Sequence, residues 1–475
     1  MSTVEAVTRA AAGAAAGLAA MGRAGRARLL RAAADEIEKR RDALIATAAR
    51  ETHLGEARLD GEVTRTAYQL RVFADVLDEG SYLEATIDHA GDTPMGPGPD
   101  LRRLLVPLGP VAVFGASNFP LAFSVPGGDT ASALAAGCPV VLKAHESHPE
   151  TSELAFEALA AAVVATGAPD GTVGLIHGRE AGAELVTDPR ITAVGFTGSL
   201  GGGQALRALI ETRPEPIPFY GELASLNPLV VTPAAAAARA GSIAAGLVTA
   251  VTGSLGQLCT KPGLIFVPAD EAGDTLVAAM ATALADVPAG LLLNDRVADG
   301  YDSIGADLRS RPGVATAATG ATGAGDGATP ALLTVDAANF TADLAEECFG
   351  PLALVVRYES EKDLVDVLST LPGSLTGTIH SADGDDLGPL LAVLTPRAGR
   401  LLFDAYPTGV LVAWAQTHGG PWPSTNTVHT SVGPTAIRRF LRPLTYQNAP
   451  EQVLPEELRD GYTGIPRRVD GVLQA

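Results

Sequence analysis

The sequence contains little cysteine. Only Cys138, Cys259 and Cys348 occur in 475 residues. Three cysteines cannot build a disulfide framework, and they lack the spacing of zinc ligands. We therefore expect a reducing compartment, no metal site and a cytoplasmic protein.

Long apolar runs are also absent. No stretch of about 18 apolar residues is free of charge, glycine or proline, so no membrane span is predicted. The alanine-rich start has no basic segment before an apolar core, and Glu5 and Arg9 interrupt it. We expect neither a signal peptide nor a membrane partner.

Basic residues are outnumbered by acidic ones. The chain has 34 Lys and Arg against 54 Asp and Glu, which gives a formal net charge of −20. Such a field repels phosphate backbones and anionic lipid surfaces. A nucleic-acid partner is therefore not expected.

Neither common glycine motif for nucleotides is present in its usual form. The segment Phe196–Gly203 ends a predicted strand and opens a helix, but it lacks GxGxxG spacing, and no GK[ST] follows. Its glycines still allow a phosphate to approach the backbone at a helix N-terminus, and Ser199 adds a hydroxyl. A purely structural turn is an equally good interpretation.

The sequence does contain short apolar runs that alternate with helical segments. With 47% hydrophobic residues, we expect two or three domains at about 100–200 residues each. The alternation predicts an α/β fold with a parallel sheet covered by helices. Predicted strands are Leu101–Pro107, Val111–Gly115, Pro139–Lys143, Gly171–His177, Ile191–Phe196, Leu229–Thr232, Leu264–Val267, Ala353–Tyr358 and Leu375–Ile379.

Helical periodicity covers residues 2–50, Gly61–Leu77, Asp129–Ala136 and Thr151–Thr166. Two segments are predicted to be irregular. Gly91–Asp100 holds three prolines and three glycines, and Thr316–Thr329 is a low-complexity run of Gly, Ala and Thr.

Cys259 lies in the short turn Gly253–Thr260 between two apolar runs. A thiol presented by a tight turn, with backbone N–H groups nearby, is a candidate nucleophile. An isolated cysteine is more often a small buried hydrophobe, so the turn alone does not decide its role.

Two polar residues could assist such a nucleophile. Glu222 has mostly apolar neighbours, which raise a carboxylate pKa and suit a general base. Asn118 follows a predicted strand and could donate its amide N–H to a developing oxyanion. A surface or capping Glu and a turn-forming Asn are the alternatives.

Charged residues also follow the predicted strand that ends at Lys143. Lys143 and Glu146 lie where ligands bind in open α/β sheets, and both could reach ribose hydroxyls. The segment Glu346–Pro351 has a similar character, with an acidic pair, an aromatic residue and a turn. Solvated loop charges are the alternative in both places.

Together, these motifs form an ordered series along almost the whole chain. Asn118, Lys143, Phe196–Ser199, Glu222, Cys259 and Glu347–Phe349 follow one another as in the aldehyde dehydrogenase superfamily, which the chain resembles. The resemblance implies an atypical Rossmann cofactor domain, a catalytic domain and a small oligomerisation element. Their expected ranges are 1–90 with 110–225, 226–432, and 91–109 with 443–475.

The resemblance also implies a role for each motif. Cys259 is the nucleophile, Glu222 activates the hydrolytic water, and Asn118 with the Cys259 N–H forms the oxyanion hole. The expected cofactor residues are Gly198, Ser199 and Gly203 at the pyrophosphate, Lys143 and Glu146 at the adenosine ribose, and Glu347 and Phe349 at the nicotinamide ribose. No metal is implied.

The chemistry that this resemblance implies is a thiohemiacetal that loses hydride and becomes a thioester. A water deprotonated by Glu222 then releases a carboxylate. A coenzyme-A-acylating relative would not need that base, so Glu222 favours hydrolysis.

Several segments are similar to the 2,5-dioxovalerate (α-ketoglutarate semialdehyde) dehydrogenase subgroup. They include Gly115–Ser124, Gly256–Gly263, Tyr406–Gly409 and His418–Pro421. Ser117 and the pair Ala224-Ser225 depart from the general superfamily but fit this subgroup. Asp404 and the aliphatic segment Val410–Ala413 fit the subgroup less closely.

The expected substrate is therefore α-ketoglutarate semialdehyde. A medium- or long-chain fatty aldehyde is the alternative within the same chemistry, and a non-catalytic binding protein is the alternative from another class. NAD and NADP are both expected to serve, because Glu146 favours ribose hydroxyls and Lys143 could pair with a 2′-phosphate. A homodimer or homotetramer is expected from the resemblance.

Overall fold

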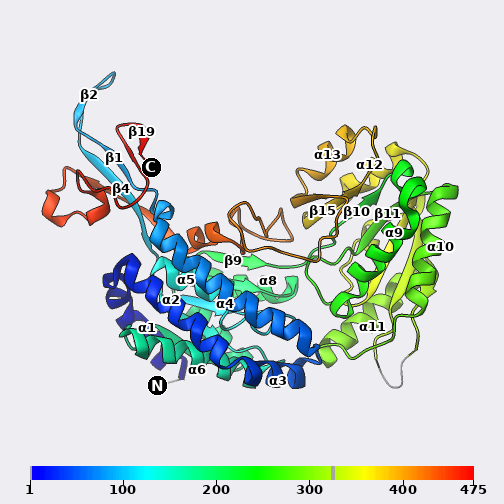
Figure 1. Cartoon of the computed structure of the whole chain (residues 1–475), viewed down its shortest axis with the longest axis horizontal. Helices are drawn as coiled ribbons and strands as arrows, with labels where there is room; N and C mark the ends of the chain where they lie inside the picture. Colours follow the sequence, from blue (N-terminus) through cyan, green and yellow to red (C-terminus); the bar gives the residue numbers. More distant parts are fainter. Residues whose placement is uncertain (1–2, 323–326, 475) are drawn as a thin grey trace.

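The computed structural model describes residues 3–322 and 327–474, and within them the strands form three main sheets (Figure 1). Two sheets are covered by helices on both faces, and the third lies in an arm that projects from one end of the molecule. The sequence-based expectation of an α/β fold with parallel sheets is confirmed for the two large units.

The first unit is a five-stranded parallel sheet in the order β7-β6-β5-β8-β9. Its strands are short and almost wholly apolar, as expected for strands buried on both faces. They are β5 (Val111–Phe114), β6 (Val140–Lys143), β7 (Val173–Ile176), β8 (Ala193–Thr197) and β9 (Phe219–Glu222).

Helices from the first half of the chain surround this sheet. They are α1 (Thr3–Ala20), α2 (Gly22–Lys39), α3 (Arg41–Thr52), α4 (Glu56–Glu79), α5 (Gly128–Ala136), α6 (Pro149–Thr166), α7 (Arg179–Thr187) and α8 (Leu200–Glu211). The helical region predicted over residues 2–50 is thus divided into the separate helices α1, α2 and α3. Leu29, Leu30 and Ile37 of α2 lie in the core against α4 and α6, which explains their helical spacing.

The second unit is a seven-stranded sheet in the order β12-β13-β14-β11-β10-β15-β16. All neighbours pair in parallel except the edge strand β12. The strands are β10 (Leu229–Val231), β11 (Leu264–Pro268), β12 (Ala315–Thr319), β13 (Ala331–Asp336), β14 (Leu352–Tyr358), β15 (Ser374–His380) and β16 (Ala398–Phe403).

Helices cover both faces of the second sheet. One core contains side chains of α9 (Pro233–Thr252) and α10 (Glu271–Ala285). The other contains side chains of α11 (Asp295–Ser310), α12 (Glu361–Thr370) and α13 (Gly388–Leu394). Pro233–Gly256 is long and apolar enough to cross a membrane by length and composition alone. Because Ile243, Leu247 and Val251 pack in the core with α10, we interpret α9 as a covering helix of this sheet.

The third sheet forms the projecting arm, in the order β17-β4-β1-β18-β19. Its longest pair, formed by the edge strand β17 and its neighbour β4, is antiparallel, with Leu441 opposite Pro107 and Gln447 opposite Leu101. The strands are β1 (Thr86–Asp88), β4 (Leu101–Pro107), β17 (Leu441–Gln447), β18 (Arg467–Val469) and β19 (Val472–Gln474).

The prediction of an irregular segment over Gly91–Asp100 is wrong. The strands β2 (Gly91–Thr93) and β3 (Gly96–Gly98) form an exposed antiparallel hairpin at the tip of the arm. Gly96 supplies the positive φ of 108° that the turn needs. The glycines and prolines of this segment are therefore compatible with a regular hairpin and do not mark an irregular loop.

The expectation of a loop over Thr316–Thr329 is only partly right. Residues 315–319 form β12, which pairs with β13 through backbone hydrogen bonds that require no particular side chains. Ala321 and Ala328 each form an isolated bridge, and residues 323–326 of the predicted loop lie outside the described residues.

Candidate active site

The expected site residues of the first unit collect at one edge of its sheet. Asn118 follows β5, Lys143 ends β6, Gly198 follows β8, and Glu222 ends β9. Because these strands are neighbours and parallel, their carboxyl ends share one edge. Ligands of open α/β sheets bind at such an edge.

Cys259 comes from the second unit, in the turn between α9 and β11. Ser254, Leu255 and Gly256 have consecutive positive φ angles of 52°, 53° and 67°. A side chain on Gly256 would place its Cβ 2.1 Å from the Gly350 carbonyl oxygen. The turn is therefore pressed against the Glu346–Pro351 segment, and only glycine fits at position 256.

Two buried side chains hold the chain around Cys259. Asn227 donates from Nδ2 to the Cys259 oxygen at 2.8 Å and to the Lys261 oxygen at 3.0 Å. Lys261 donates from Nζ to the carbonyls of Cys348, Gly350 and Leu352, at 2.7, 3.0 and 2.7 Å. The turn of Cys259 and the segment of Glu347 are thus tied together.

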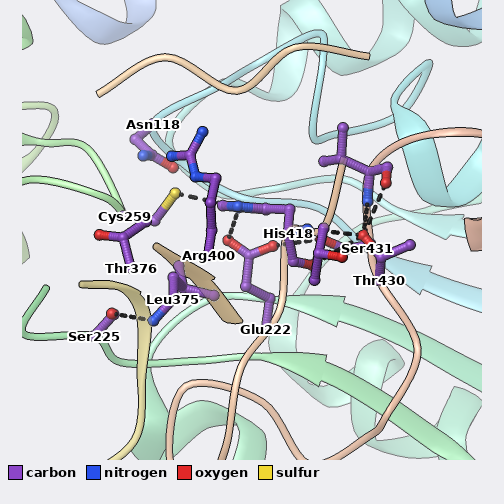
Figure 2. A network of polar contacts seen from close by, with 12 residues as sticks. Asn118, Glu222, Ser225, Cys259, Leu375, Thr376, Arg400, His418, Thr430 and Ser431 are labelled. Carbon is purple, nitrogen blue, oxygen red and sulfur yellow. Dashed lines mark hydrogen bonds and ion pairs between the residues drawn. The ribbon is translucent and has the colours of Figure 1, made fainter. Parts of the chain in front are cut away.

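The thiol, a carboxylate and an imidazole meet where the two units face each other (Figure 2). Nε2 of His418 lies 2.8 Å from Glu222 Oε1 and 3.6 Å from Cys259 Sγ. Ser431 donates to Glu222 Oε2 at 2.8 Å. Glu222 and His418 are almost completely buried, whereas Cys259 is partly exposed.

Glu222 is ionised more readily than an ordinary glutamate. Burial opposes its charge, but His418, the Ser431 hydroxyl and the Cys259 thiol outweigh burial and lower its pKa. This corrects the expectation from the sequence that an apolar setting raises it. The local sequence is apolar, but the partners come from distant segments.

Cys259 experiences the opposite effect. Burial and the negative charge of Glu222 raise the pKa of the thiol well above its ordinary value, with Glu347 adding to the effect. The residue's own backbone N–H acts in the other direction. The thiol consequently needs a proton acceptor. The Glu222 carboxylate is in reach, whereas His418 Nε2 already donates its hydrogen to Glu222 Oε1.

A small cavity borders the carboxylate. Its volume is about 10 Å³, and its lining includes Glu222, His418, Ser431 and Arg439. A space of this size is near the minimum for one water molecule, and it has several polar partners.

Asn118 lies next to the Cys259 turn. Its Nδ2 donates to the Gln257 oxygen at 2.9 Å, two residues before the nucleophile candidate, and the side chain is buried. Figure 2 shows the Asn118 carboxamide beside the Cys259 side chain. The structure thus brings Asn118, Glu222 and Cys259 together.

The glycine-rich turn forms an exposed N-terminus for α8. Ser199 is the N-cap and accepts a hydrogen bond from Gly202 N at 3.2 Å, and the first turn has no acidic residue. A Cβ on Gly203 would lie 2.4 Å from Leu223, so this glycine permits close helix packing. An N-terminus of this kind suits an anion.

Lys143 and Glu146 form an ion pair at the end of β6, with Lys143 buried and Glu146 exposed. Glu347 and Phe349 lie on the segment that Lys261 holds, and both are half-buried. Burial is the main cause that raises the pKa of Glu347 to about 7, which Lys261 opposes and Glu222 reinforces. Glu347 is therefore close enough to Cys259 and Glu222 for their charges to interact.

The cluster of Glu222, Cys259 and His418 could also offer three ligand atoms to a metal ion, since these atoms lie within 4.8 Å of one another. The sequence alone predicts no metal site, because the three residues are scattered along the chain. Two of the three atoms already contact each other at 2.8 Å, which satisfies the imidazole and carboxylate without an ion.

Sequence reasoning missed the roles of His418, Lys261 and Asn227. His418 belongs to a subgroup-like segment, but its contact with Cys259 spans 159 residues. No local pattern connects such distant positions. Of the three, only Lys261 could have been identified from the sequence, because it lies two residues after Cys259.

The comparisons with known proteins agree with this geometry. Residues 1–442 match the aldehyde dehydrogenase family. The chain is 50% identical over 460 residues to alpha-ketoglutaric semialdehyde dehydrogenase 2 of Azospirillum brasilense, covering 94% of this chain and 87% of that protein. It is 43% identical to alpha-ketoglutaric semialdehyde dehydrogenase of Acinetobacter baylyi, with the same coverage.

A solved structure shares the fold. The 1-pyrroline-5-carboxylate dehydrogenase from Thermus with bound NAD aligns with a TM-score of 0.79 at 23% identity, over 94% of this chain and 85% of that one. The expected aldehyde dehydrogenase fold is confirmed. With a family match over nearly its whole length and relatives at up to half identity, this chain belongs to the aldehyde dehydrogenase family.

Proposed function

We propose that this enzyme oxidises α-ketoglutarate semialdehyde to 2-oxoglutarate with NAD(P). The names of both relatives support the substrate. The observation that carries the reaction is the meeting of Cys259 Sγ, His418 Nε2 and Glu222 from three distant segments. A nucleophile, a base and an orienting group within one cluster suit covalent acyl chemistry.

Cys259 begins the reaction as a thiolate. Its proton passes to solvent or to the adjoining Glu222 carboxylate, because His418 Nε2 already donates its hydrogen to Glu222 Oε1. The sulfur then bonds to the aldehyde carbon, and the carbonyl oxygen becomes an alkoxide. Asn118 Nδ2 and the Cys259 backbone N–H are the donors that stabilise it.

A nicotinamide cofactor, when bound, accepts the hydride that converts this adduct to a thioester. Glu222 then takes a proton from a water, whose oxygen bonds to the thioester carbon. The C–S bond breaks, and the carboxylate product leaves the regenerated thiolate. The lowered pKa of Glu222 keeps it ionised, while His418 and Ser431 fix its two oxygens.

The residues present fit a dinucleotide. The exposed turn Gly198–Gly203 would take the pyrophosphate, with N–H groups at the start of α8 and no acidic side chain opposing it. Lys143 and Glu146 would hold the adenosine ribose, and Glu347 with Phe349 would hold the nicotinamide ribose.

Both cofactor forms are proposed to serve. Glu146 accepts ribose hydroxyls, and Lys143, which contacts Glu146, can turn to a 2′-phosphate. We expect KM values for NAD and NADP within about a hundredfold, since one exchanged ion pair is worth a few kcal/mol at most. A thousandfold higher KM for NADP would refute dual use.

The three sheets are proposed to divide the work. Residues 1–90 and 110–225 bind the cofactor, residues 226–432 carry the nucleophile, and residues 91–109 with 443–475 join subunits in a dimer or tetramer. The support is the placement of β4 and β17 in a sheet separate from β9, which ends at Glu222, and from β11, which follows Cys259.

The substrate is tested by comparing kcat/KM for α-ketoglutarate semialdehyde and pentanal. We expect the semialdehyde to be preferred. A preference for pentanal of about a hundredfold, roughly 2.8 kcal/mol in transition-state binding, would instead support a fatty aldehyde substrate. Absence of NAD(P)H formation with any aldehyde, together with unselective labelling of Cys259 by iodoacetamide, would support a non-catalytic binding role.

A further inference from the structure

Two arginines that the reaction does not use lie beside the nucleophile. Arg65 comes from α4 of the first unit, and Arg400 comes from β16 of the second. Figure 2 shows the Arg400 side chain next to Cys259 and Asn118. Among the described residues, neither arginine forms an ion pair with a carboxylate, which is unusual for a guanidinium that is largely removed from water.

Arg65 presents one edge of its guanidinium without a partner. Nη1 donates to the Val410 oxygen, and the group lies 5.2 Å from the centre of the Phe123 ring. Nε and Nη2 are buried and form no hydrogen bond. These two nitrogens form the side of the guanidinium that binds both oxygens of a carboxylate.

Arg400 holds the same loop from the other unit. Its Nη1 donates to the Gly409 oxygen at 2.7 Å, and its Nη2 donates to the Pro407 oxygen at 2.8 Å. Its Nε is buried and has no partner. Both arginines therefore donate to backbone oxygens of the segment Pro407–Val410. Each also keeps at least one buried guanidinium nitrogen without a hydrogen-bond partner.

A short series of contacts links Arg65 to the reacting sulfur. The Phe123 ring that Arg65 covers lies 6.0 Å from the His418 ring, and His418 Nε2 lies 3.6 Å from Cys259 Sγ. Burial lowers the pKa of Arg65, and the charges of Glu62, Cys259 and Glu222 oppose that shift. The Cys259 charge acts on the pKa of Arg400 in the same way.

Glu62 does not satisfy Arg65. Its Oε1 accepts hydrogen bonds from the backbone N–H groups of Leu121 and Ala122, at 2.8 and 2.9 Å. Its Oε2 has no hydrogen bond and lies 4.0 Å from Nη2 of Arg58. The free edge of Arg65 is thus available to a ligand.

We propose that Arg65, assisted by Arg400, binds the carboxylate of the substrate at the end remote from the aldehyde. The arginines would select an anionic oxo acid over an uncharged aldehyde of equal length. This inference rests on the proposed function. An alkanal would leave buried donors unpaired, whereas a carboxylate would satisfy them and supply the missing counter-charge.

The test compares Arg65→Met with the unmodified enzyme on two five-carbon aldehydes, α-ketoglutarate semialdehyde and pentanal. We expect kcat/KM for the semialdehyde to fall by about a hundredfold, as expected when a charge-assisted bidentate pair is lost. For pentanal we expect a change of no more than about threefold, because no charged group of that substrate loses a partner. The loss should lie mainly in KM.

Arg71→Met is the matched control. Arg71 lies on the same helix as Arg65, but it is only half-buried and pairs with Asp35 and Glu38. Its replacement should leave the ratio of the two kcat/KM values unchanged. Arg65→Lys keeps the charge but loses the two-nitrogen edge, so an intermediate fall of about tenfold is expected. It also provides the measurement if Arg65→Met does not fold.

A binding experiment separates recognition from catalysis. Glutarate, a five-carbon dicarboxylate without an aldehyde, should slow the labelling of Cys259 by iodoacetamide in the unmodified enzyme and not in Arg65→Met. Equal losses on both aldehydes, with glutarate protection retained, would overturn the role of Arg65 while leaving the proposed substrate intact. A preference of the unmodified enzyme for pentanal would overturn the proposed substrate itself.

Discussion

Glu222 is subject to two opposing demands at the scale of a single residue. As the base for hydrolysis it must be ionised, and its contacts to His418 and Ser431 keep its pKa low. The same negative charge raises the pKa of the Cys259 thiol. One carboxylate therefore assists the second half of the reaction and opposes thiolate formation in the first.

Replacing Glu222 by Gln should separate these two effects. Steady-state turnover should fall by about 10²–10⁴-fold, because the thioester loses its general base. The labelling of Cys259 by iodoacetamide at pH 8 should become faster, because removing a neighbouring negative charge lowers the thiol pKa. In the unmodified enzyme the labelling rate should rise as the pH increases toward the raised thiol pKa, and in the variant this rise should begin at lower pH.

A burst of NAD(P)H equal to the number of active sites should remain in Glu222→Gln, since the thioester still forms. Cys259→Ser supplies the control, with no burst and no labelling at position 259. Slower labelling in Glu222→Gln would instead identify Glu222 as the group that takes the thiol proton.

The sequence revealed the residues that sit in recognisable local motifs. Asn118, Glu222 and Cys259 were predicted and meet in space. His418, Arg65 and Arg400 were not predicted as site residues, because their positions beside the nucleophile arise only when distant segments of the chain pack together. The partners that lower the Glu222 pKa could not be read from its neighbours either.

The turn that presents Cys259 is an element whose backbone conformation is itself part of the site. Three successive residues occupy the left-handed region, which costs an ordinary residue about 1–2 kcal/mol. Asn227 and Lys261 hold the following residues in place.

Gly256→Ala should disturb this turn, because its Cβ would lie 2.1 Å from the Gly350 oxygen and its φ is 67°. We expect a loss of about 1–3 kcal/mol in unfolding free energy and a fall of about tenfold or more in kcat. Thermal unfolding and initial rates provide the measurement.

Gly253→Ala is the matched change at the start of the same turn. Its φ is −53°, and a Cβ at this position would meet no atom within 4 Å beyond its chain neighbours. The free energy of unfolding of this variant should remain within about 0.5 kcal/mol of that of the unmodified enzyme. Equal effects at positions 253 and 256 would contradict the role given to the contact with Gly350.

Elements with strong apolar patterns were predicted well, and weakly patterned ones were not. The strand Leu101–Pro107 has the bounds that its pattern predicts. The strand Phe219–Glu222 was missed, because it has four residues and contains both Gly and Glu. This strand forms through parallel pairing with β8, and the local sequence does not predict that pairing.

At the scale of the whole molecule, the arm is the feature that the predicted dimer or tetramer would use. Its edge strand β17 has an unpaired side within the described chain, and the hairpin tip carries Met95, which is 96% exposed. Unpaired strand edges are ready templates for pairing with another chain. The oligomeric state itself stays a prediction.

The reacting groups are divided between the two large units. Glu222 and Asn118 belong to the first, Cys259 to the second, and the two are joined by contacts such as Leu223 N to the Ser424 oxygen at 2.9 Å. Catalytic competence is thus a property of their docking rather than of either unit. As denaturant concentration rises, activity should therefore be lost while the helical circular dichroism signal is still intact. A low concentration of denaturant would then inactivate the enzyme without unfolding either unit.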